Sequence, residues 1–444
     1  MVCVLYMHFL KEPDSGPFAD YHVPSDVQET VKDIIDRVRA NGDSAVREFT
    51  ETFDDVSRKS NVLQPAEREA ALDRVSEKER RIIDNSVKNI RQFAEVQLGH
   101  VEEFEEEIRK GVTLGQKIVP IENVGAYVPG GEYPLLSSPL MSVIPSDVAG
   151  VETVAVAMPP QDDGTPHPAA IYGAMQAGAT DIYVVGGAQA IVALATGTEE
   201  ISKVDKIVGP GNIFVTEAKR QMYGEVGIDL LAGPSEILVI ADESADPEVV
   251  AADLLAQAEH DVAARPLLVT MSERTGNAVI SKVESQLQTL STAEIAGEAW
   301  DTMGAVIVVD DMNEAVDVSD DLAPEHLQVQ VQNPRSILNR LTNYGTVFLG
   351  ENSANVFSDK LIGTNHILPT QRSARYTAGL SVHEFVKYQT YQEVSDDAAA
   401  ELEQWATPQS IIERLEGHAK SSYIRGPSKG LEGFSMDSHE LPKD

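Results

Sequence analysis

The pattern of apolar and polar positions changes near residue 120. Before that point, residues 26–110 are rich in charged side chains, and apolar residues recur with a period near 3.6, which predicts amphipathic helices. Asp26 is in position to cap the first of these helices, and Gly42 is in position to end it. After residue 120, short runs of Val, Ile and Ala alternate with helical segments. This alternation predicts parallel β-sheets that are covered by helices on both faces.

The predicted strands of this second part are too numerous for one sheet, so we expect two α/β units. From about residue 376 to the end, the pattern becomes polar and indicates helices. The predicted strands occupy residues 153–160, 181–187, 235–242, 265–272, 304–311 and 345–351.

Composition narrows the class of protein. The 444 residues include 35 Lys and Arg against 71 Asp and Glu, a formal net charge of −36 that is spread along the chain. Such a surface repels phosphate backbones and anionic lipids, which disfavours binding to nucleic acids or membranes. A hydrophobic content of 42% excludes a disordered acidic chain. An acidic surface with only 16 lysines indicates a folded enzyme that stays soluble at high salt, as in a halophile.

The single cysteine, Cys3, excludes an internal disulfide framework and a cysteine-based metal site. No run of 18 apolar residues predicts a membrane span. The apolar residues 1–10 lack a basic start and a cleavage site, so we expect a cytoplasmic protein without a signal peptide. Translation could start at either Met1 or Met7.

Three glycine-rich turns each follow an apolar strand. They are YVPGGEYP (127–134), VVGGAQA (184–190) and IVGPGN (207–212). Any one of them is explained by a chain reversal, which favours glycine. Three together indicate a crevice at the carboxyl ends of the strands, where open sheets bind nucleotides. Neither G-x-G-x-x-G after a strand nor G-x-x-x-x-G-K-[ST] occurs.

Two segments carry candidate chemistry. Gln257 and His260 share one face of the predicted helix and could present a metal with oxygen and nitrogen ligands, although His260 could instead complement the helix dipole. Glu325 and His326 lie at the entrance to an apolar strand, either as a proton-transfer pair or as exposed loop residues.

Further histidines and acids lie in the last quarter of the chain. Asp359 and His366 flank Gly363 in an unpatterned loop, and His418 follows Glu413 on a late helix. Such distant residues can converge on one metal ion, but their spacing does not show that they do.

These segments together resemble the histidinol dehydrogenase family. The resemblance covers residues 28–425 and implies a homodimeric, zinc-containing, NAD-dependent enzyme. Such enzymes oxidise a primary alcohol through an aldehyde to a carboxylate and reduce two NAD per turnover. The segments that carry the resemblance, in chain order, are YVPGG, VGGAQA, IVGPGN, AGPSEILV, LLAQAEHD, APEHL and GTNHILPT.

The resemblance also implies the organisation of the chain. The fold would contain two incomplete Rossmann-like α/β domains with parallel sheets and a helical C-terminal tail that packs on the dimer partner. The expected parts are an N-terminal tail (1–25), a discontinuous first α/β domain (26–122 and 238–375), an NAD-binding second α/β domain (123–237) and the helical dimerisation tail (376–444).

Matched position by position, the resemblance implies roles for individual residues. Glu325 and His326 would be the catalytic pair, with His326 taking the alcohol proton and Glu325 activating the water that hydrates the aldehyde. The zinc ligands would be Gln257, His260, Asp359 and, across the dimer interface, His418. Substrate contacts would come from these ligands, His326, Ser235, His366 and Glu413. NAD contacts would come from Tyr127, Gln189 and Asn212.

Several segments depart from the usual family pattern. Residues 132–136 read EYPLL where alanine-alanine-tyrosine-proline-serine is usual, and Lys360 replaces a tyrosine. The segments 298–300, 344–351, 374–385 and 416–419 are more similar to the paralogous sulfopropanediol 3-dehydrogenases. That branch oxidises 2,3-dihydroxypropane-1-sulfonate to sulfolactate.

Charge chemistry bears on the choice between these two substrates. A sulfonate needs cationic partners, for which Lys360 and Arg375 are candidates. Glu413 would instead pair with an amine, which favours histidinol. We expect the sulfonate as substrate, with the oxidation of L-histidinol to L-histidine as the alternative.

Overall fold

The structure is a computed structural model that describes residues 8–14, 16, 23–130, 135–427 and 430–436. Cys3, the alternative starts Met1 and Met7, and residues 132–134 of the unusual EYPLL segment lie outside the described residues. The chain divides into two compact units. Unit 1 comprises Met1–Leu98 and Ile121–Phe385, and unit 2 comprises Gly99–Pro120 and Val386–Asp444. No helix in the described ranges is long and apolar enough to cross a membrane.

The first sheet of unit 1 has six strands in the order β1-β11-β10-β9-β12-β13. All its neighbouring strands are parallel except β1, which pairs antiparallel with β11. The strands are β1 (His8–Lys11), β9 (Glu236–Ala241), β10 (Arg265–Thr270), β11 (Ala305–Val308), β12 (His326–Gln330) and β13 (Thr346–Leu349).

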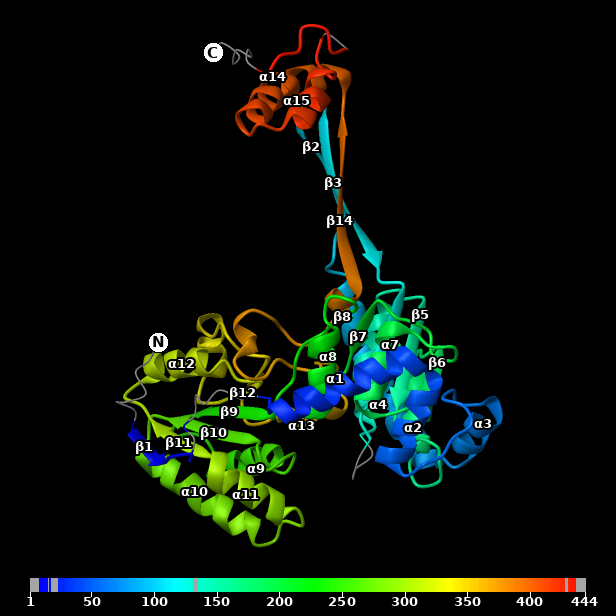
Figure 1. Cartoon of the computed structure of the whole chain (residues 1–444). Helices are drawn as coiled ribbons and strands as arrows, with labels where there is room; N and C mark the ends of the chain where they lie inside the picture. Colours follow the sequence, from blue (N-terminus) through cyan, green and yellow to red (C-terminus); the bar gives the residue numbers. More distant parts are fainter. Residues whose placement is uncertain (1–7, 15, 17–22, 131–134, 428–429, 437–444) are drawn as a thin grey trace. The chain divides into compact units, whose positions relative to one another are not determined.

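Helices cover both faces of this sheet (Figure 1). Along β9, Ile237 and Val239 pack against α9 (Pro247–Ala258), α10 (Glu273–Leu287) and α11 (Ala293–Met303). Leu238 and Ile240 face α12 (Met312–Leu322) on the other side. Because both faces are buried, the strand is an uninterrupted apolar run from Ile237 to Ala241.

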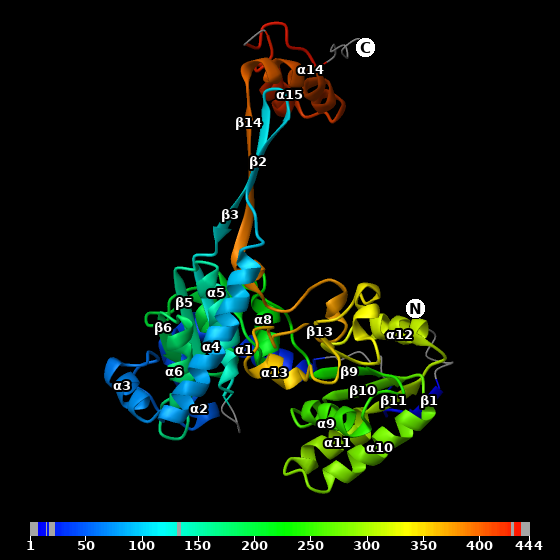
Figure 2. The same cartoon turned by 180° about the vertical axis from the view of Figure 1, so that it is seen from behind.

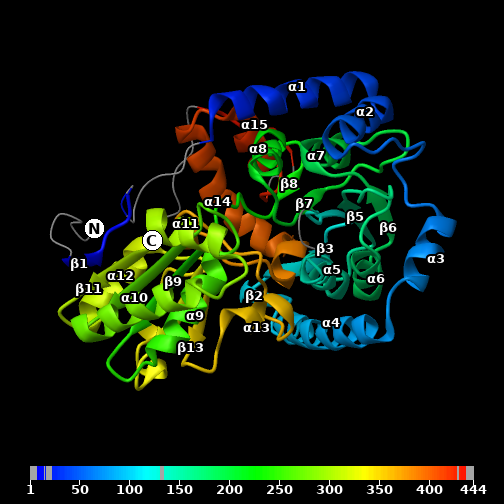
Figure 3. The same ribbon diagram turned by 90° about the horizontal axis from the view of Figure 1, so that it is seen from below.

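The second sheet of unit 1 has five parallel strands in the order β6-β5-β4-β7-β8. The strands are β4 (Asn123–Tyr127), β5 (Thr153–Met158), β6 (Asp181–Val184), β7 (Lys206–Val208) and β8 (Gly227–Ile228). Its helices are α5 (Ser137–Val148), α6 (Pro168–Ala177), α7 (Gly187–Thr196) and α8 (Ile213–Met222). Figure 3 shows α7 and α8 on one side of these strands and α5 and α6 on the other. The prediction of an α/β fold with parallel sheets is confirmed.

The N-terminal helices pack on the helices that flank this second sheet. We expected residues 26–122 to join 238–375, but α1 contacts α7 and α8, and α4 contacts α5 and α6 (Figure 3). Amphipathic periodicity shows that one helix face is buried, but not which surface covers it. The four N-terminal helices are α1 (Ser25–Asn41), α2 (Asp43–Asp54), α3 (Pro65–Asp73) and α4 (Glu77–Leu98).

Two further differences concern the first residues. Gly42 ends α1 as predicted, whereas Asp26 lies in the first turn and Pro24 occupies the N-cap position. Within the expected tail 1–25, β1 adds an edge strand to the six-stranded sheet.

Unit 2 contains a three-stranded antiparallel sheet and two helices, α14 (Asp396–Ile412) and α15 (Glu416–Tyr423) (Figure 2). The strands are β2 (Phe104–Arg109), β3 (Val112–Pro120) and β14 (Val386–Val394). The tail 376–444, which we expected to be helical, therefore includes the strand β14 ahead of its two helices. The predicted helical region 26–110 ends with α4, before β2. Every residue of β2 is exposed, so its sequence carries no core periodicity from which the strand could be predicted.

Candidate active site

A cavity of about 320 Å³ in unit 1 gathers residues from distant parts of the chain. It lies at the amino ends of β9 and β12, and the turns that follow β4 and β7 contribute Pro129, Pro210 and Gly211. The predicted site residues that line it are Ser235, Gln257, His260, Glu325, His326, Asp359, Lys360 and His366.

His326 is the first residue of β12 and is only 4% exposed. Its Nδ1 donates to the Glu236 carbonyl oxygen at 2.9 Å, because a carbonyl can only accept. The Nε2 atom is buried and has no hydrogen-bond partner among the described residues, while Asp359 Oδ1 lies 3.9 Å away. Nε2 is therefore the nitrogen that can exchange a proton with a molecule in the cavity.

Glu325 completes a pair with His326. Its Oε2 accepts a hydrogen bond from the Glu236 backbone N–H at 2.8 Å and lies 3.4 Å from His326 Nδ1. Burial by itself would lower the pKa of His326. The charges of Glu325 and Asp359, with the bond to Glu236, outweigh burial and raise that pKa to about 9.

Glu236 is a site residue that the sequence analysis did not single out. Its backbone holds both Glu325 and His326, and its buried side chain accepts a hydrogen bond from the Gln371 N–H at 3.1 Å. Burial, followed by the charge of Glu325, raises the pKa of Glu236 to about 7. An acid at the first position of the apolar strand in AGPSEILV was the available signal.

Three of the expected metal ligands, Gln257, His260 and Asp359, line this cavity. Helix α9 ends at Ala258, so His260 lies just beyond it and places Nδ1 3.2 Å from the Gln257 carbonyl oxygen. Asp359 belongs to the short helix α13 (Asn355–Lys360) and not to a loop as predicted. Asn355 donates to Gln257 Oε1 at 3.1 Å and thereby orients that amide.

In the described part of the chain, no group of three or more His, Cys, Asp or Glu is arranged to hold a metal ion. The expected set includes an amide, Gln257, and its fourth member, His418, belongs to unit 2. Nitrogen and oxygen donors beside a cavity nevertheless match the chemistry of a catalytic zinc site. A cation held at Asp359 would neutralise this carboxylate and so reduce its contribution to the raised pKa of His326.

A buried polar cluster fixes α9 on β12. Asp253 lies one helical turn before Gln257, and its Oδ2 accepts hydrogen bonds from Gln328 Nε2 at 2.7 Å and Gln330 Nε2 at 2.8 Å. Burial raises the pKa of Asp253 to about 6. The cluster therefore holds the helix of Gln257 against the strand of His326.

The two cationic side chains that we considered for a sulfonate differ in position. Lys360 lines the cavity. Arg375 is absent from its lining and donates to the Asp321 carbonyl oxygen at 2.7 Å. His366 also lines the cavity, with Nδ1 3.0 Å from the Asp359 carbonyl oxygen, and burial lowers its pKa.

Two predicted site residues lie in unit 2. His418 is in α15, and Glu413 follows α14; both are exposed. Glu413 Oε1 accepts a hydrogen bond from Gln409 at 3.1 Å. Their roles as a metal ligand and a substrate contact stay predictions.

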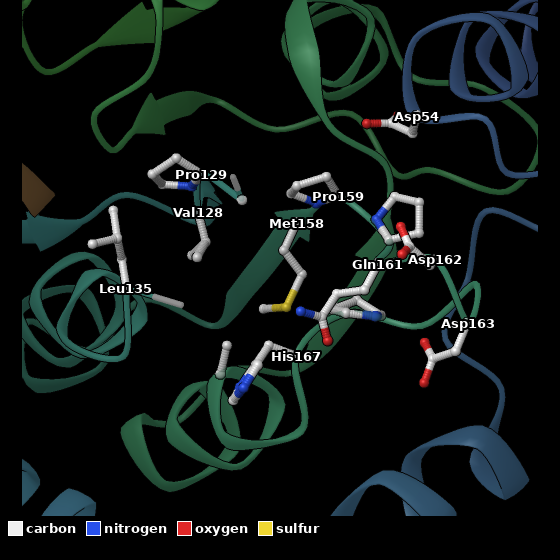
Figure 4. A pocket seen from close by; sticks show the side chains of 14 residues that line it. Asp54, Val128, Pro129, Leu135, Met158, Pro159, Gln161, Asp162, Asp163 and His167 are labelled. Carbon is white, nitrogen blue, oxygen red and sulfur yellow. The ribbon is translucent and has the colours of Figure 1, made fainter. Parts of the chain in front are cut away.

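A second cavity, of about 510 Å³, lies at the carboxyl ends of β4 and β5 (Figure 4). Leu135 lies on one side of it in this view, and Asp54, Asp162 and Asp163 lie on the other. Burial raises the pKa of Asp54 to about 6. Of the three glycine-rich turns that predicted a crevice, only the first contributes described residues to this cavity, through Val128, Pro129 and Gly130.

The three residues predicted to contact NAD are placed around the glycine-rich turns but outside the lining of both cavities. The Tyr127 hydroxyl accepts a hydrogen bond from the Gly187 N–H at 3.1 Å. The buried amide of Gln189 has no partner in the ranges that the structure describes. Asn212 caps α8 by accepting from the N–H groups of Phe214 and Val215, each at 3.1 Å.

Comparison with known proteins gives the family. The sequence profile described as "Histidinol dehydrogenase" matches residues 20–426. A "Histidinol dehydrogenase homolog" of Shouchella clausii is 44% identical over 400 residues, covering 90% of this chain and 94% of the relative. A "Histidinol dehydrogenase" of Geobacillus kaustophilus is 44% identical over 398 residues, covering 90% and 93%.

Solved structures agree with the sequence relatives. The crystal structure of histidinol dehydrogenase from Elizabethkingia anophelis aligns with a TM-score of 0.88 and 35% identity, covering 94% of each chain. The chain therefore belongs to the histidinol dehydrogenase family, whose members are NAD-dependent oxidoreductases that act on CH–OH donors. The family is generally zinc-dependent and typically homodimeric.

Proposed function

We propose that this protein oxidises L-histidinol to L-histidine, a four-electron reaction that passes through an aldehyde and reduces two NAD. The observation that carries the proposal is the buried Glu325–His326 pair. His326, whose Nε2 has no hydrogen-bond partner among the described residues, lines one cavity with Gln257, His260 and Asp359. The relatives that bear the name histidinol dehydrogenase favour this substrate over the sulfonate.

The catalytic pair divides the proton transfers. In its neutral form, which a cation at Asp359 would favour, His326 accepts the hydroxyl proton of the alcohol at Nε2, because its Nδ1 is committed to the Glu236 carbonyl. Glu325 then removes a proton from the water that hydrates the aldehyde, which prepares the second oxidation. The Glu236 backbone holds both side chains in place through the two steps.

Gln257, His260 and Asp359, with the His418 of a second copy, would hold zinc. When bound, zinc polarises the alcohol oxygen and NAD accepts the hydride in each oxidation. Ser235, His366, Glu413 and the ligands themselves would orient the substrate.

The cavity of Figure 4 is the proposed place for part of NAD. It adjoins the turns after β4 and β5, where open parallel sheets bind nucleotides. The amide of Gln189, which has no partner in the part of the chain that the structure describes, offers both a donor and an acceptor. Tyr127 and Asn212 hold the neighbouring turns through hydrogen bonds.

We also infer that residues 123–237 and 238–375 form the two incomplete Rossmann-like domains and that the tail 376–444 joins two copies. Unit 2 exposes large apolar side chains for such a contact: Tyr388, Trp405, Ile412, Leu415 and Ile424 are each at least 40% exposed.

The acidic composition supports the proposal that the enzyme is active at high salt, as in a halophile.

Oxidation of 2,3-dihydroxypropane-1-sulfonate is the second candidate function. Lys360 supports it, because this ammonium lines the cavity and could pair with a sulfonate. Arg375 no longer supports it, because Asp321 engages that guanidinium. The cavity also contains Asp261, Glu325 and Asp359, which suit a cationic substrate better than an anionic one.

The deciding experiment measures NADH yield per substrate at molar KCl with zinc present. We expect two NADH for each L-histidinol and almost none from the sulfonate. Two NADH from the sulfonate alone would instead assign the protein to organosulfonate oxidation. No NADH from either substrate would overturn both candidate functions.

A further inference from the structure

One wall of the active-site cavity is built from two chain segments that are joined by a buried ion pair. The first segment is the turn after β7, which contributes Pro210 and Gly211. The second is residues 230–235, which ends at Ser235 beside β9. Neither segment is part of a helix or a strand, so other contacts must hold them in position.

Asp229 and Lys219 supply these contacts. Asp229 Oδ2 accepts from the Gly209 N–H at 2.8 Å, and its Oδ1 accepts from the Leu230 N–H at 2.6 Å and pairs with Lys219 Nζ. Lys219 Nζ donates to the Gly209 carbonyl oxygen at 3.0 Å. Both polar groups of the Gly209 backbone are thus bound by the two members of one ion pair.

The pair is almost completely buried, with 3% of the Lys219 side chain and 1% of the Asp229 side chain exposed. Lys219 belongs to α8, the helix that Asn212 caps. Thr216, on the same helix, donates to the Ala232 carbonyl oxygen at 3.0 Å. Helix α8 therefore anchors both wall segments.

Gly209 leaves little freedom for another arrangement. Its φ is +114°, and a Cβ atom would come within 2.1 Å of the Tyr127 carbonyl oxygen. The turn therefore carries no side chain at Gly209 that could hold it, and only backbone hydrogen bonds are available there.

We propose that Lys219 and Asp229 are positioning residues for this cavity: they clamp the Gly209–Gly211 turn to the 230–235 segment and thereby preorganise the cofactor and substrate contacts. The expected effect on NAD binding rests on the proposed function. The positions of the two wall segments can be tested separately, by hydrogen exchange, without any catalytic turnover. Neither residue touches the reacting atoms, since both lie behind the wall.

The test must separate positioning from stability. In Asp229→Asn, one amide oxygen cannot replace both carboxylate oxygens, and the amide N–H₂ would face either the Gly209 N–H or Lys219. The double variant Lys219→Met/Asp229→Leu removes both charges and fills the space with apolar atoms, which often restores stability at a buried ion pair. It cannot restore the bonds to Gly209.

Lys206→Met is the matched control. Lys206 is also a buried lysine, in β7 next to the same turn, but it donates to the Glu384 carbonyl oxygen and pairs with the Glu384 carboxylate, whereas Lys219 donates to the Gly209 carbonyl oxygen. Each variant is examined for its thermal midpoint, its NADH affinity by fluorescence, and hydrogen exchange of the amides of residues 207–213.

We expect Asp229→Asn to exchange these amides at least tenfold faster and to bind NADH at least tenfold more weakly. The double variant should regain most of the wild-type thermal midpoint but keep the faster amide exchange and the weaker NADH binding. In Lys206→Met, the exchange rate and the NADH affinity should each differ from wild type by less than twofold. Recovery of exchange and affinity in the double variant would make the pair merely structural and overturn the proposal. If the wild type bound no NADH, the proposed function would fail. Hydrogen exchange alone would still show whether Lys219 and Asp229 hold the two wall segments together.

Discussion

The buried carboxyl of Asp253 makes the stability of this protein depend on pH in a direction that can be measured. Its pKa is about 6 in the folded protein against 3.8 for an ordinary aspartate, because burial disfavours the charged form. The folded state therefore binds this proton more tightly than the unfolded state does. The resulting stabilisation is complete below pH 3.8 and is lost as pH rises through 6.

The variant Asp253→Asn should not lose stability through ionisation at this position as pH rises, because asparagine does not titrate. Both glutamine amides donate to a single oxygen, Oδ2, which the asparagine Oδ1 can replace. The Oε1 atoms of Gln328 and Gln330 are buried and lack partners among the described residues, so the added amide donor has acceptors nearby. A difference of about two pKa units corresponds to up to about 3 kcal/mol at pH 7.

Urea denaturation of wild type and variant from pH 4 to pH 8 measures the effect. The free energy of unfolding of the variant relative to wild type should rise with pH, mostly between pH 4 and 7. Asp317→Asn, which removes an exposed carboxylate, should show no such rise. A constant difference across this range, or a variant that becomes relatively less stable as pH rises, would refute the argument from burial.

Three further predictions concern the cavity. Glu325→Gln should slow the oxidation of the aldehyde by at least about tenfold, because the water loses its base, and should leave part of the alcohol oxidation; stopped-flow NADH formation from each substrate separates the two. His260→Ala should weaken zinc binding by about 10- to 100-fold in a chelator competition, whereas Asp317→Asn should not change it. Lys360→Tyr should lower any sulfonate turnover far more than zinc affinity, and equal sulfonate turnover in variant and wild type would remove Lys360 from the substrate site.

The sequence predicted the parallel α/β character well, because apolar strands buried on both faces leave a local signature, as β9 does. It also indicated Glu325 and His326 at a strand entrance, and β12 does begin at His326. It did not indicate β2 or β14, whose side chains are almost all exposed. These strands are stabilised by pairing with β3, which depends on residues elsewhere in the chain.

The sequence predicted which chemical groups belong to the site, but it did not predict how they are arranged in space. Residue types identify the atoms that can bind a metal or move a proton, but the two backbone bonds from Glu236 that hold Glu325 and His326 have no signature in residue type. Arg375 illustrates the converse: its charge suggested a substrate contact, and the fold pairs it with Asp321.

The sequence by itself thus determined the fold class, the family resemblance and the inventory of reactive groups, because periodicity and residue identity are local properties. Only the tertiary structure decided that α1–α4 pack on the helices of the five-stranded sheet and that Gln257, His326 and Asp359 line one cavity. It also decided that Lys219 and Asp229 join two segments of the cavity wall. These contacts join residues far apart in the chain, and the packing of whole helices and sheets selects them.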